Sequence, residues 1–328
     1  MKFGIIGTNW ITDAFIEAAQ EVNGFELTAV YSRTKEKAEE FAGKYGVETT
    51  FTNLEAMAAS NDIEAVYIAS PNAFHAEHAS LFLKNKKHVL CEKPVASNAK
   101  EASKMFGVAK ENNVLLMEAL KSTLLPNFKV VEENLHKLGK IRRYFASYCQ
   151  YSSRYDAYKE GTVLNAFNPQ FSNGSIMDIG VYCIYPLVVL FGKPESVKAT
   201  GVLLESGVDG EGSVVLKYKD MDAVVMYSKI TNSNLPAEIQ GEDGNLVIDK
   251  IHTPEKVEIF YRNGEKEELS QPQKAKTMFY EAEEFIRLAQ EGETESETNS
   301  IENSITTMEI IDEIRKQIGV VFPSDGLE

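Results

Sequence analysis

In the first 120 residues, short apolar runs alternate with segments whose apolar residues recur at helical spacing. The runs that predict strands lie at 2–6, 26–31, 65–69, 88–90 and 114–117. Asn98, followed three residues later by Glu101, predicts the capped start of one intervening helix. Strands and helices that alternate at this spacing predict right-handed βαβ units around a parallel sheet.

The pattern changes near residue 120. After a helix at 127–138, β-type runs dominate, at 143–151, 197–204, 213–219, 223–230 and 256–262. Turn sequences such as 241–244 separate these runs, which predicts a mainly antiparallel sheet. Two amphipathic helices, at 278–291 and 301–318, end the pattern. We therefore predict an α/β protein: an N-terminal Rossmann domain with a doubly wound parallel sheet (1–120) and a C-terminal α+β domain for substrate binding and oligomerisation (121–328).

Composition narrows the class of protein. The chain of 328 residues is 43% hydrophobic and 25% charged, and its formal net charge is −15. The acidic balance disfavours nucleic acid and anionic membranes as partners, although local basic groups still permit a phosphate-bearing cofactor. Three cysteines far apart predict neither disulfides nor a metal site. No window approaches the roughly 18 apolar residues of a membrane span, and no signal peptide is expected, so we predict a cytoplasmic protein.

Ligands of open parallel sheets bind beyond the carboxyl ends of the strands, so those ends are the informative positions. The first strand is followed by Gly7, Thr8, Asn9, Trp10 and Ile11. This is a degraded dinucleotide fingerprint in which Asn9 replaces a glycine, and asparagine tolerates left-handed backbone geometry. The helix that follows offers amides and a positive dipole end to a pyrophosphate. A simple glycine turn is the alternative interpretation.

The second strand ends in Ser32, Arg33 and Thr34, with Lys37 one turn later. A site specific for NAD(H) usually has an acidic residue here, which binds the ribose 2′-hydroxyl group. None is present, and an arginine can contact a 2′-phosphate and cover the adenine ring. The sequence therefore favours NADP(H), while NAD(H) stays possible; the alternative for Arg33 is an ordinary surface position.

Two later strand ends carry further candidates. The run at 65–69 leads into Ser70, Pro71 and Asn72, and Asn72 is placed either to bind the cofactor or to cap the next helix. His75 lies in the same cofactor-binding segment, and we expect it to be structural rather than catalytic. The run at 88–90 leads into Glu92, Lys93 and Pro94, and Glu118 lies at the end of the next strand. An ammonium group at Lys93 can orient a substrate oxygen and share in proton transfer.

The segment 92–94 resembles the hallmark of the glucose–fructose oxidoreductase, inositol dehydrogenase and rhizopine-catabolism (Gfo/Idh/MocA) family. The segments 70–75, 87–91 and 173–182 also look like that family, and the resemblance extends over nearly all 328 residues. It implies that Lys93 is the catalytic lysine and Asp178 the substrate-orienting aspartate. Tyr182 stands where many members have histidine, which resembles the dimeric dihydrodiol dehydrogenases and NADP-linked D-xylose dehydrogenases.

The spacing agrees independently, because Asp178 and Tyr182 are four residues apart and share one face of any helix that contains them. The resemblance implies that Tyr182 is the general acid for carbonyl reduction, with a packed core aromatic as the alternative. Two departures from the family pattern concern cofactor geometry and substrate contacts. Asn9 replaces a glycine, and Thr123 stands where an arginine is common, with Lys121 as a possible substitute from a different backbone position.

These residues predict hydride transfer between NADP(H) and a carbonyl or secondary alcohol of a sugar, polyol or cyclic diol. The alternatives are a non-catalytic NAD(P)-binding sensor and an enzyme of this fold that uses NAD or recycles a tightly bound cofactor. The family resemblance also implies a homodimer or higher homo-oligomer through the uncovered face of the C-terminal sheet. For that face the alternating apolar residues suggest Val214, Leu216, Tyr218, Val225 and Tyr227.

Overall fold

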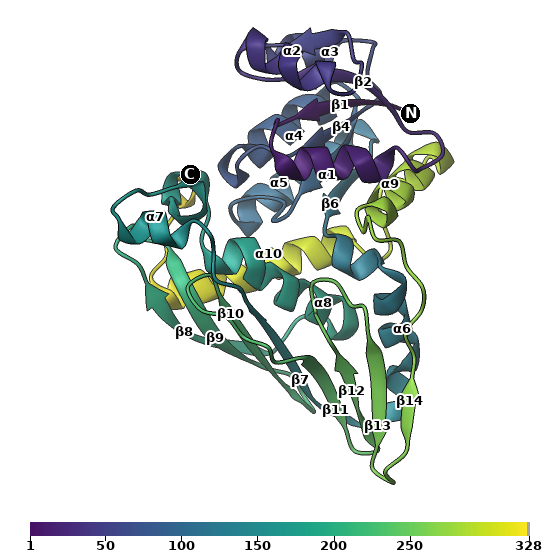
Figure 1. Cartoon of the computed structure of the whole chain (residues 1–328), viewed down its shortest axis with the longest axis vertical. Helices are drawn as coiled ribbons and strands as arrows, with labels where there is room; N and C mark the ends of the chain where they lie inside the picture. Colours follow the sequence, from purple (N-terminus) through teal and green to yellow (C-terminus); the bar gives the residue numbers. More distant parts are fainter. Residues whose placement is uncertain (327–328) are drawn as a thin grey trace. The chain divides into compact units, whose positions relative to one another are not determined.

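The computed structural model describes residues 1–326, and the chain forms two compact units. Unit 1 comprises Met1–Lys121 and Lys274–Ser304, and unit 2 comprises Ser122–Gln273 and the chain from Ile305 onward. Figure 1 shows the helices and strands of each unit along the sequence. The segment Lys274–Ser304 thus packs with the N-terminal part of the chain, whereas the sequence pattern assigned it to the second predicted domain.

Unit 1 contains a six-stranded parallel sheet in the order β3-β2-β1-β4-β5-β6. Its strands are β1 (Lys2–Ile6), β2 (Glu26–Tyr31), β3 (Thr49–Phe51), β4 (Ala65–Ile68), β5 (His88–Glu92) and β6 (Leu116–Ala119). Chain order reverses between β1 and β4, which makes their carboxyl ends the expected ligand-binding edge of a doubly wound sheet. The predicted Rossmann sheet is therefore confirmed, with β6 starting two residues later than expected.

Helices α1 (Trp10–Ala19), α2 (Lys35–Gly43), α3 (Leu54–Ala59), α4 (His75–Lys84) and α5 (Ala99–Asn112) connect these strands. A sixth helix, α9 (Phe279–Glu291), comes from the distant C-terminal segment and packs against α1. Its Phe285 lies with the ring centroid 5.7 Å from that of Phe3 on β1. The amphipathic stripe predicted at 278–291 is thus buried against the N-terminal sheet.

Unit 2 is built on an eight-stranded sheet in the order β14-β13-β12-β11-β7-β10-β9-β8. Its strands are β7 (Ile141–Cys149), β8 (Ser196–Leu203), β9 (Asp209–Lys217), β10 (Asp222–Ser228), β11 (Ala237–Gly241), β12 (Gly244–Ile248), β13 (Val257–Tyr261) and β14 (Lys266–Glu268). Every neighbouring pair is antiparallel except β7 and β10, which are parallel. This confirms the mainly antiparallel sheet. The turn predicted at 241–244 joins β11 to β12, two strands that the pattern alone did not reveal.

One face of this sheet is covered by helices, among them α8 (Val181–Phe191), which contacts β7 and β10 (Figure 1). The other helices that belong wholly or mostly to unit 2 are α6 (Pro126–Asn134), the short α7 (Tyr155–Lys159) and α10 (Ile301–Ile318), within which the boundary between the units falls.

The residues proposed for the uncovered face lie instead on the covered one. Val214, Leu216, Val225 and Tyr227 are at most 1% exposed, and Tyr218 is also buried. The two-residue period shows which side chains share a face but not which face the helices cover. The uncovered face carries Phe145, Val215, Val224 and Met226, their positions alternating with those of the buried set.

One expectation about membranes is wrong. Pro169–Phe191 contains an 18-residue window with a mean hydropathy of 1.8, which is long and apolar enough to cross a membrane by length and composition. Short 3₁₀ and π-helical turns precede α8 in this segment, and 72% of its apolar window is buried inside the protein. The segment is therefore the core helix under the large sheet, and its apolar character follows from that burial.

Candidate functional site

The turn after β1 depends on a glycine and an asparagine. Gly7 has a φ of +109°, and a Cβ atom there would lie 2.6 Å from the carbonyl oxygen of Ala69, so only glycine fits. Asn9 caps α1: its Oδ1 accepts from the amides of Ile11 (3.1 Å) and Thr12 (3.4 Å). Its Nδ2 donates to the oxygen of Ala69 at 3.2 Å, which ties this turn to the end of β4.

The left-handed geometry suggested for Asn9 is therefore wrong. Its φ is −115°, an extended conformation, and Gly7 alone adopts the positive angle in this turn. The replacement of a fingerprint glycine by asparagine supplies a helix cap, which bonds two amides that a pyrophosphate was expected to use. Beside it, Thr8 and Ile11 are half-buried, and Trp10 is 69% exposed at the first position of α1.

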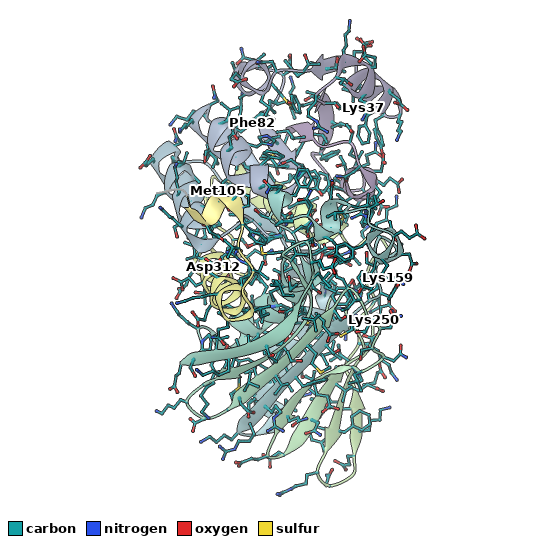
Figure 2. All side chains as sticks on the ribbon, turned by 90° about the vertical axis from the view of Figure 1, so that its left-hand side faces the viewer. Lys37, Phe82, Met105, Lys159, Lys250 and Asp312 are labelled. Atoms are coloured by element: carbon teal, nitrogen blue, oxygen red, sulfur yellow. The ribbon has the colours of Figure 1, made fainter. Side chains whose placement is uncertain are left out.

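After β2, the basic side chains project outward. Ser32 is buried, and its amide donates to the oxygen of Phe51 at 3.1 Å. Thr34 caps α2 through its Oγ1, which accepts from the amide of Lys37. Arg33 and Lys37 are exposed, with Lys37 at the surface of unit 1 (Figure 2), and Arg33 forms no ion pair within residues 1–326. The Arg33 guanidinium is therefore available to an anionic ligand.

The segment after β4 is anchored by His75. This side chain is fully buried, with Nε2 2.8 Å from the oxygen of Ser70 and Nδ1 2.9 Å from that of Pro94. Burial lowers the pKa of His75 to about 4, so the ring is neutral near pH 7 and donates one hydrogen bond. Asn72 begins a short 3₁₀ turn and occupies the N-cap of neither that turn nor α4.

At the end of β5, Lys93 is half-buried and is joined to Pro94 by a cis peptide bond. The preceding Glu92 is buried and accepts a 2.5 Å hydrogen bond from the hydroxyl group of Tyr67. Burial raises the pKa of Glu92, and the positive charge of Lys93 acts in the opposite direction. The lysine thus extends from a strand end whose adjacent carboxyl group is enclosed and hydrogen-bonded.

Two more buried carboxyl groups belong to unit 1. Glu118, at the end of β6, accepts from the amide of Val95 at 3.0 Å, and burial raises its pKa to about 7. Glu281 on α9 is completely buried, and neither of its carboxyl oxygens has a hydrogen-bond partner within the described chain. Burial raises the pKa of Glu281 well above its ordinary value, and the negative charge of Glu92 adds to the effect. Nothing in the sequence pattern distinguishes Glu281, which falls inside an otherwise ordinary amphipathic helix.

In unit 2, Asp178 lies in a π-helical turn (Ile176–Gly180) that leads directly into α8. Asp209 on β9 holds the start of this turn: its carboxylate accepts from the amides of Ser175 (3.0 Å) and Ile176 (2.8 Å). Gly174 makes this approach possible, because a Cβ atom there would lie 2.3 Å from Asp209 Oδ1. Burial raises the pKa of Asp209 to about 6.

Asp178 forms a hydrogen-bonded ion pair with Lys229, which follows β10. The Lys229 side chain is 5% exposed and that of Asp178 is 34% exposed. Lys229 is not among the residues predicted from the sequence, although it resembles Lys93 in being a lysine that follows directly on a strand of largely apolar residues.

Tyr182, in the first turn of α8, is half-buried at the edge of an aromatic cluster. Its ring is 5.9 Å from that of Tyr148 in an edge-on arrangement, and Tyr148 stacks on His252 at 4.2 Å. The phenol is therefore only partly packed into the core. Thr123 is completely buried, and the charge of Lys121 acts on Glu92 and Glu281. Within residues 1–326, no group of three or more His, Cys, Asp or Glu side chains is arranged to hold a metal ion.

Comparison with protein families gives two matches. Residues 1–120 match the Gfo/Idh/MocA oxidoreductase family, NAD-binding Rossmann fold, and residues 134–247 match the Gfo/Idh/MocA C-terminal domain. Scyllo-inositol 2-dehydrogenase (NADP(+)) of Bacillus subtilis is 60% identical over 99% of both chains. Trans-1,2-dihydrobenzene-1,2-diol dehydrogenase of the mouse is 30% identical, also over 99% of both. These matches confirm the resemblance inferred from the motifs.

Solved structures share the fold at lower identity. A 3-ketoreductase from Actinomadura kijaniata, in complex with NADP and TDP-benzene, superimposes with a TM-score of 0.85 at 24% identity and covers 98% of this chain and 99% of its own. An aldose-aldose oxidoreductase from Caulobacter crescentus has a TM-score of 0.85 at 19% identity, with 97% of each chain covered. At these identities the likeness concerns the fold.

Proposed function

Because this chain belongs to the Gfo/Idh/MocA oxidoreductase family, we propose that it transfers a hydride between NADP(H) and a secondary-alcohol carbon of a cyclic polyol, with scyllo-inositol as the substrate. The observation that carries the substrate is the 60% identity, over 99% of both chains, to an NADP-dependent scyllo-inositol dehydrogenase. The diol dehydrogenase at 30% identity acts on a related ring that bears adjacent hydroxyl groups. Sugars and other polyols are the wider substrate class.

The cofactor preference rests on the end of β2. No carboxylate occupies the position that would bind a ribose 2′-hydroxyl group, and Arg33 is exposed there without an ion pair in the described chain. A guanidinium binds a phosphate through two parallel hydrogen bonds, so a 2′-phosphate gains a contact that NAD(H) cannot make. Ser32, Thr34 and Lys37 would complete the polar surroundings of this phosphate.

When NADP⁺ is bound, C4 of its nicotinamide would accept the hydride. Three residues of the chain have proposed roles in the reaction. Lys93 would polarise the substrate oxygen, and Tyr182 would take the hydroxyl proton as the carbonyl forms, then return it in the reverse direction. Asp178 would fix the ring through hydrogen bonds to its hydroxyl groups. A positive charge beside a phenol favours the ionised form that accepts the proton.

The test measures the formation of NADPH from scyllo-inositol and NADP⁺, alongside NAD⁺. We expect faster turnover with NADP⁺. Lys93→Ala should lower kcat about 100-fold or more, while the Kd for NADPH stays within about twofold. Arg33→Ala should weaken NADPH about tenfold and leave NADH nearly unchanged. Lys84→Ala and Lys35→Ala, on exposed helix positions, are the matched controls.

Other results would favour the alternatives. Tight NADPH binding without turnover on any polyol, sugar or diol would support a non-catalytic sensor. A preference for NADH that is the same in wild type and in Arg33→Ala would support an NAD-dependent enzyme. Nicotinamide that stays bound through purification would support a cofactor recycled in place.

Two further features belong to this proposal: the contact between subunits and the cellular compartment. The uncovered sheet face of unit 2 exposes part of Val215 (47%) beside Phe145, Val224 and Met226, and we assign the homodimer contact to it. Cys91, Cys149 and Cys183 are all free thiols, which is consistent with a reducing compartment and supports the assignment to the cytoplasm.

A further inference from the structure

We propose that Lys229 is a positioning residue for the substrate: its enclosed ammonium group keeps the partly exposed Asp178 carboxylate charged and fixed in one orientation for binding a hydroxyl-bearing ligand. The inference rests on the proposed function, because it gives Asp178 the role of binding the polyol. It adds a residue that neither the sequence motifs nor the family resemblance indicates.

The two side chains differ sharply in exposure. Asp178 is 34% exposed, whereas Lys229 is 5% exposed and lies with its nitrogen 5.6 Å from the ring centroid of Phe167, a fully buried residue. A ligand in solution can therefore reach the carboxylate but not the ammonium group behind it. Lys229 must act through Asp178.

The backbone around Lys229 is fixed on both sides. Its amide donates to the oxygen of Gly210 at 2.9 Å, and its own oxygen accepts from the amide of Ser152 at 2.8 Å. Asp178 is fixed as well, because Asp209 binds the amides at the start of its helical turn. The ion pair thus joins two rigid elements, which is the condition for setting the orientation of a carboxylate to within a small angle.

The surrounding charges alternate in sign. Lys229 pairs with Asp178 and also acts electrostatically on Asp209, so one ammonium group influences two carboxyl groups from different elements. Without the cation, Asp178 would lose its counter-ion while the charge of Asp209 remained nearby. Both changes favour the protonated carboxyl group, which accepts fewer hydrogen bonds from substrate hydroxyls.

Stability alone does not explain this lysine. A buried ion pair contributes little net stability, because desolvation offsets the attraction, and removal of one partner is costly mainly when the charge left behind stays buried. Lys229→Met would leave Asp178 partly hydrated and fill the space next to Phe167. The converse change, Asp178→Asn, would leave a buried ammonium group without its counter-ion. We therefore expect the methionine variant to fold and to reveal the functional role.

The experiment compares wild type, Lys229→Met, Asp178→Asn and the double variant in scyllo-inositol oxidation over a range of pH. Lys229→Met should raise KM about tenfold or more, with a smaller change in kcat, and should move the acid limb of kcat/KM to higher pH by about one unit. The Kd for NADPH should be unchanged. The double variant should be no worse than the poorer single variant, because both changes remove one interaction. Lys250→Met, at an exposed ion pair (Figure 2), is the control.

Carbon-13 spectra of aspartate-labelled protein give a readout that needs no turnover. The carboxyl resonance that disappears in Asp178→Asn should titrate at higher pH in Lys229→Met than in wild type. An unshifted resonance together with an unchanged acid limb would overturn the proposal. A deterioration of kcat, KM and NADPH binding that simply follows the fraction of folded protein would also overturn it. If wild type does not oxidise scyllo-inositol, the proposed function fails, and the carboxyl titration alone decides the role of Lys229.

Discussion

At the scale of single residues, unit 1 buries three carboxyl groups, two at the ends of β5 and β6 and one on α9. Glu92, Glu118 and Glu281 are all buried, and burial raises the pKa of each. Lys93 and Lys121 are the cations whose charges counteract these shifts. Carboxyl groups in such an environment favour the neutral form, which makes the stability of this unit depend on pH.

Glu118 allows the sign of this dependence to be worked out. Its ordinary pKa is 4.5, and in the folded protein it is about 7. Between these values the unfolded chain has released the proton and the folded chain still holds it. The contribution of Glu118 to the free energy of unfolding therefore falls by about 1.4 kcal/mol per pH unit as the pH rises through this window.

Glu118→Gln removes this slope and keeps an oxygen that accepts from the amide of Val95. The stability of the variant relative to wild type should therefore be greater at pH 7 than at pH 5, as measured by urea denaturation at both values. Glu111→Gln, an exposed position on α5, is the control and should show no such difference. A difference in stability that is equal at both pH values would contradict the assignment.

The residue scale also shows what sequence can and cannot predict. Lys93 was identified because a lysine between a glutamate and a proline at a strand end has no simple packing role. Lys229 has a similar position, but it fell within the strand predicted at 223–230. Membership of that strand already accounted for the lysine, so no functional role was predicted for it. Glu281 was not predictable, because its burial depends on the packing of α9 into unit 1. Glu281 is 160 residues further along the chain than Lys121, where the N-terminal part of that unit ends.

At the scale of elements, predictions succeeded where a segment was long and periodic. The helices α9 and α10 lie within a residue of the expected ranges, and Asn98 caps α5 as predicted, accepting from the amide of Glu101 at 2.9 Å. The strands β3 and β14 have three residues each, too few to establish a period. The face of the large sheet was assigned wrongly because alternation is symmetrical with respect to the two faces.

The turn between β1 and α1 gives a prediction at this scale. Asn9→Ala removes the cap of α1 and should lower the free energy of unfolding by about 1 kcal/mol, whereas Asn9→Gly should cost only a few tenths. Asn9→Gly also releases the amides of Ile11 and Thr12, so NADPH affinity should be kept or improved.

Denaturation and fluorescence titration with NADPH measure the two effects separately. Asn53→Ala removes a similar cap, from α3, and should reduce stability without changing NADPH affinity. If Asn9→Gly stayed stable but bound NADPH several-fold more weakly, Asn9 itself would contact the cofactor.

At the scale of the whole molecule, the change of pattern near residue 120 indicated two bodies, since alternating strands and helices give way there to antiparallel strands. The return of Lys274–Ser304 to unit 1 could not be inferred this way. It depends on contacts such as that between Phe285 and Phe3, which join distant parts of the chain. A hydrophobic stripe shows that a helix is covered, not by which element.

The uncovered face of the large sheet allows a prediction about assembly. On the uncovered sheet face, Phe145 on β7 is opposite Val224 on β10, which is opposite Val215 on β9. This row of apolar side chains crosses three adjacent strands, and a second copy of the same face would bury it in a two-fold symmetric contact. Stable interfaces bury about 800 Å² per partner, and the sheet that presents this row has eight strands.

We therefore expect light scattering at micromolar concentration to give about twice the 36.6 kDa chain mass. Val215→Glu should produce a monomer, because two like charges would meet in the contact, and should fold normally because Val215 is 47% exposed in the single chain. Val321→Glu introduces the same charge at a position that is 69% exposed outside the sheet and should leave the dimer intact. A monomeric wild type would remove the assembly role of this face, and a dimeric Val215→Glu would place the contact elsewhere.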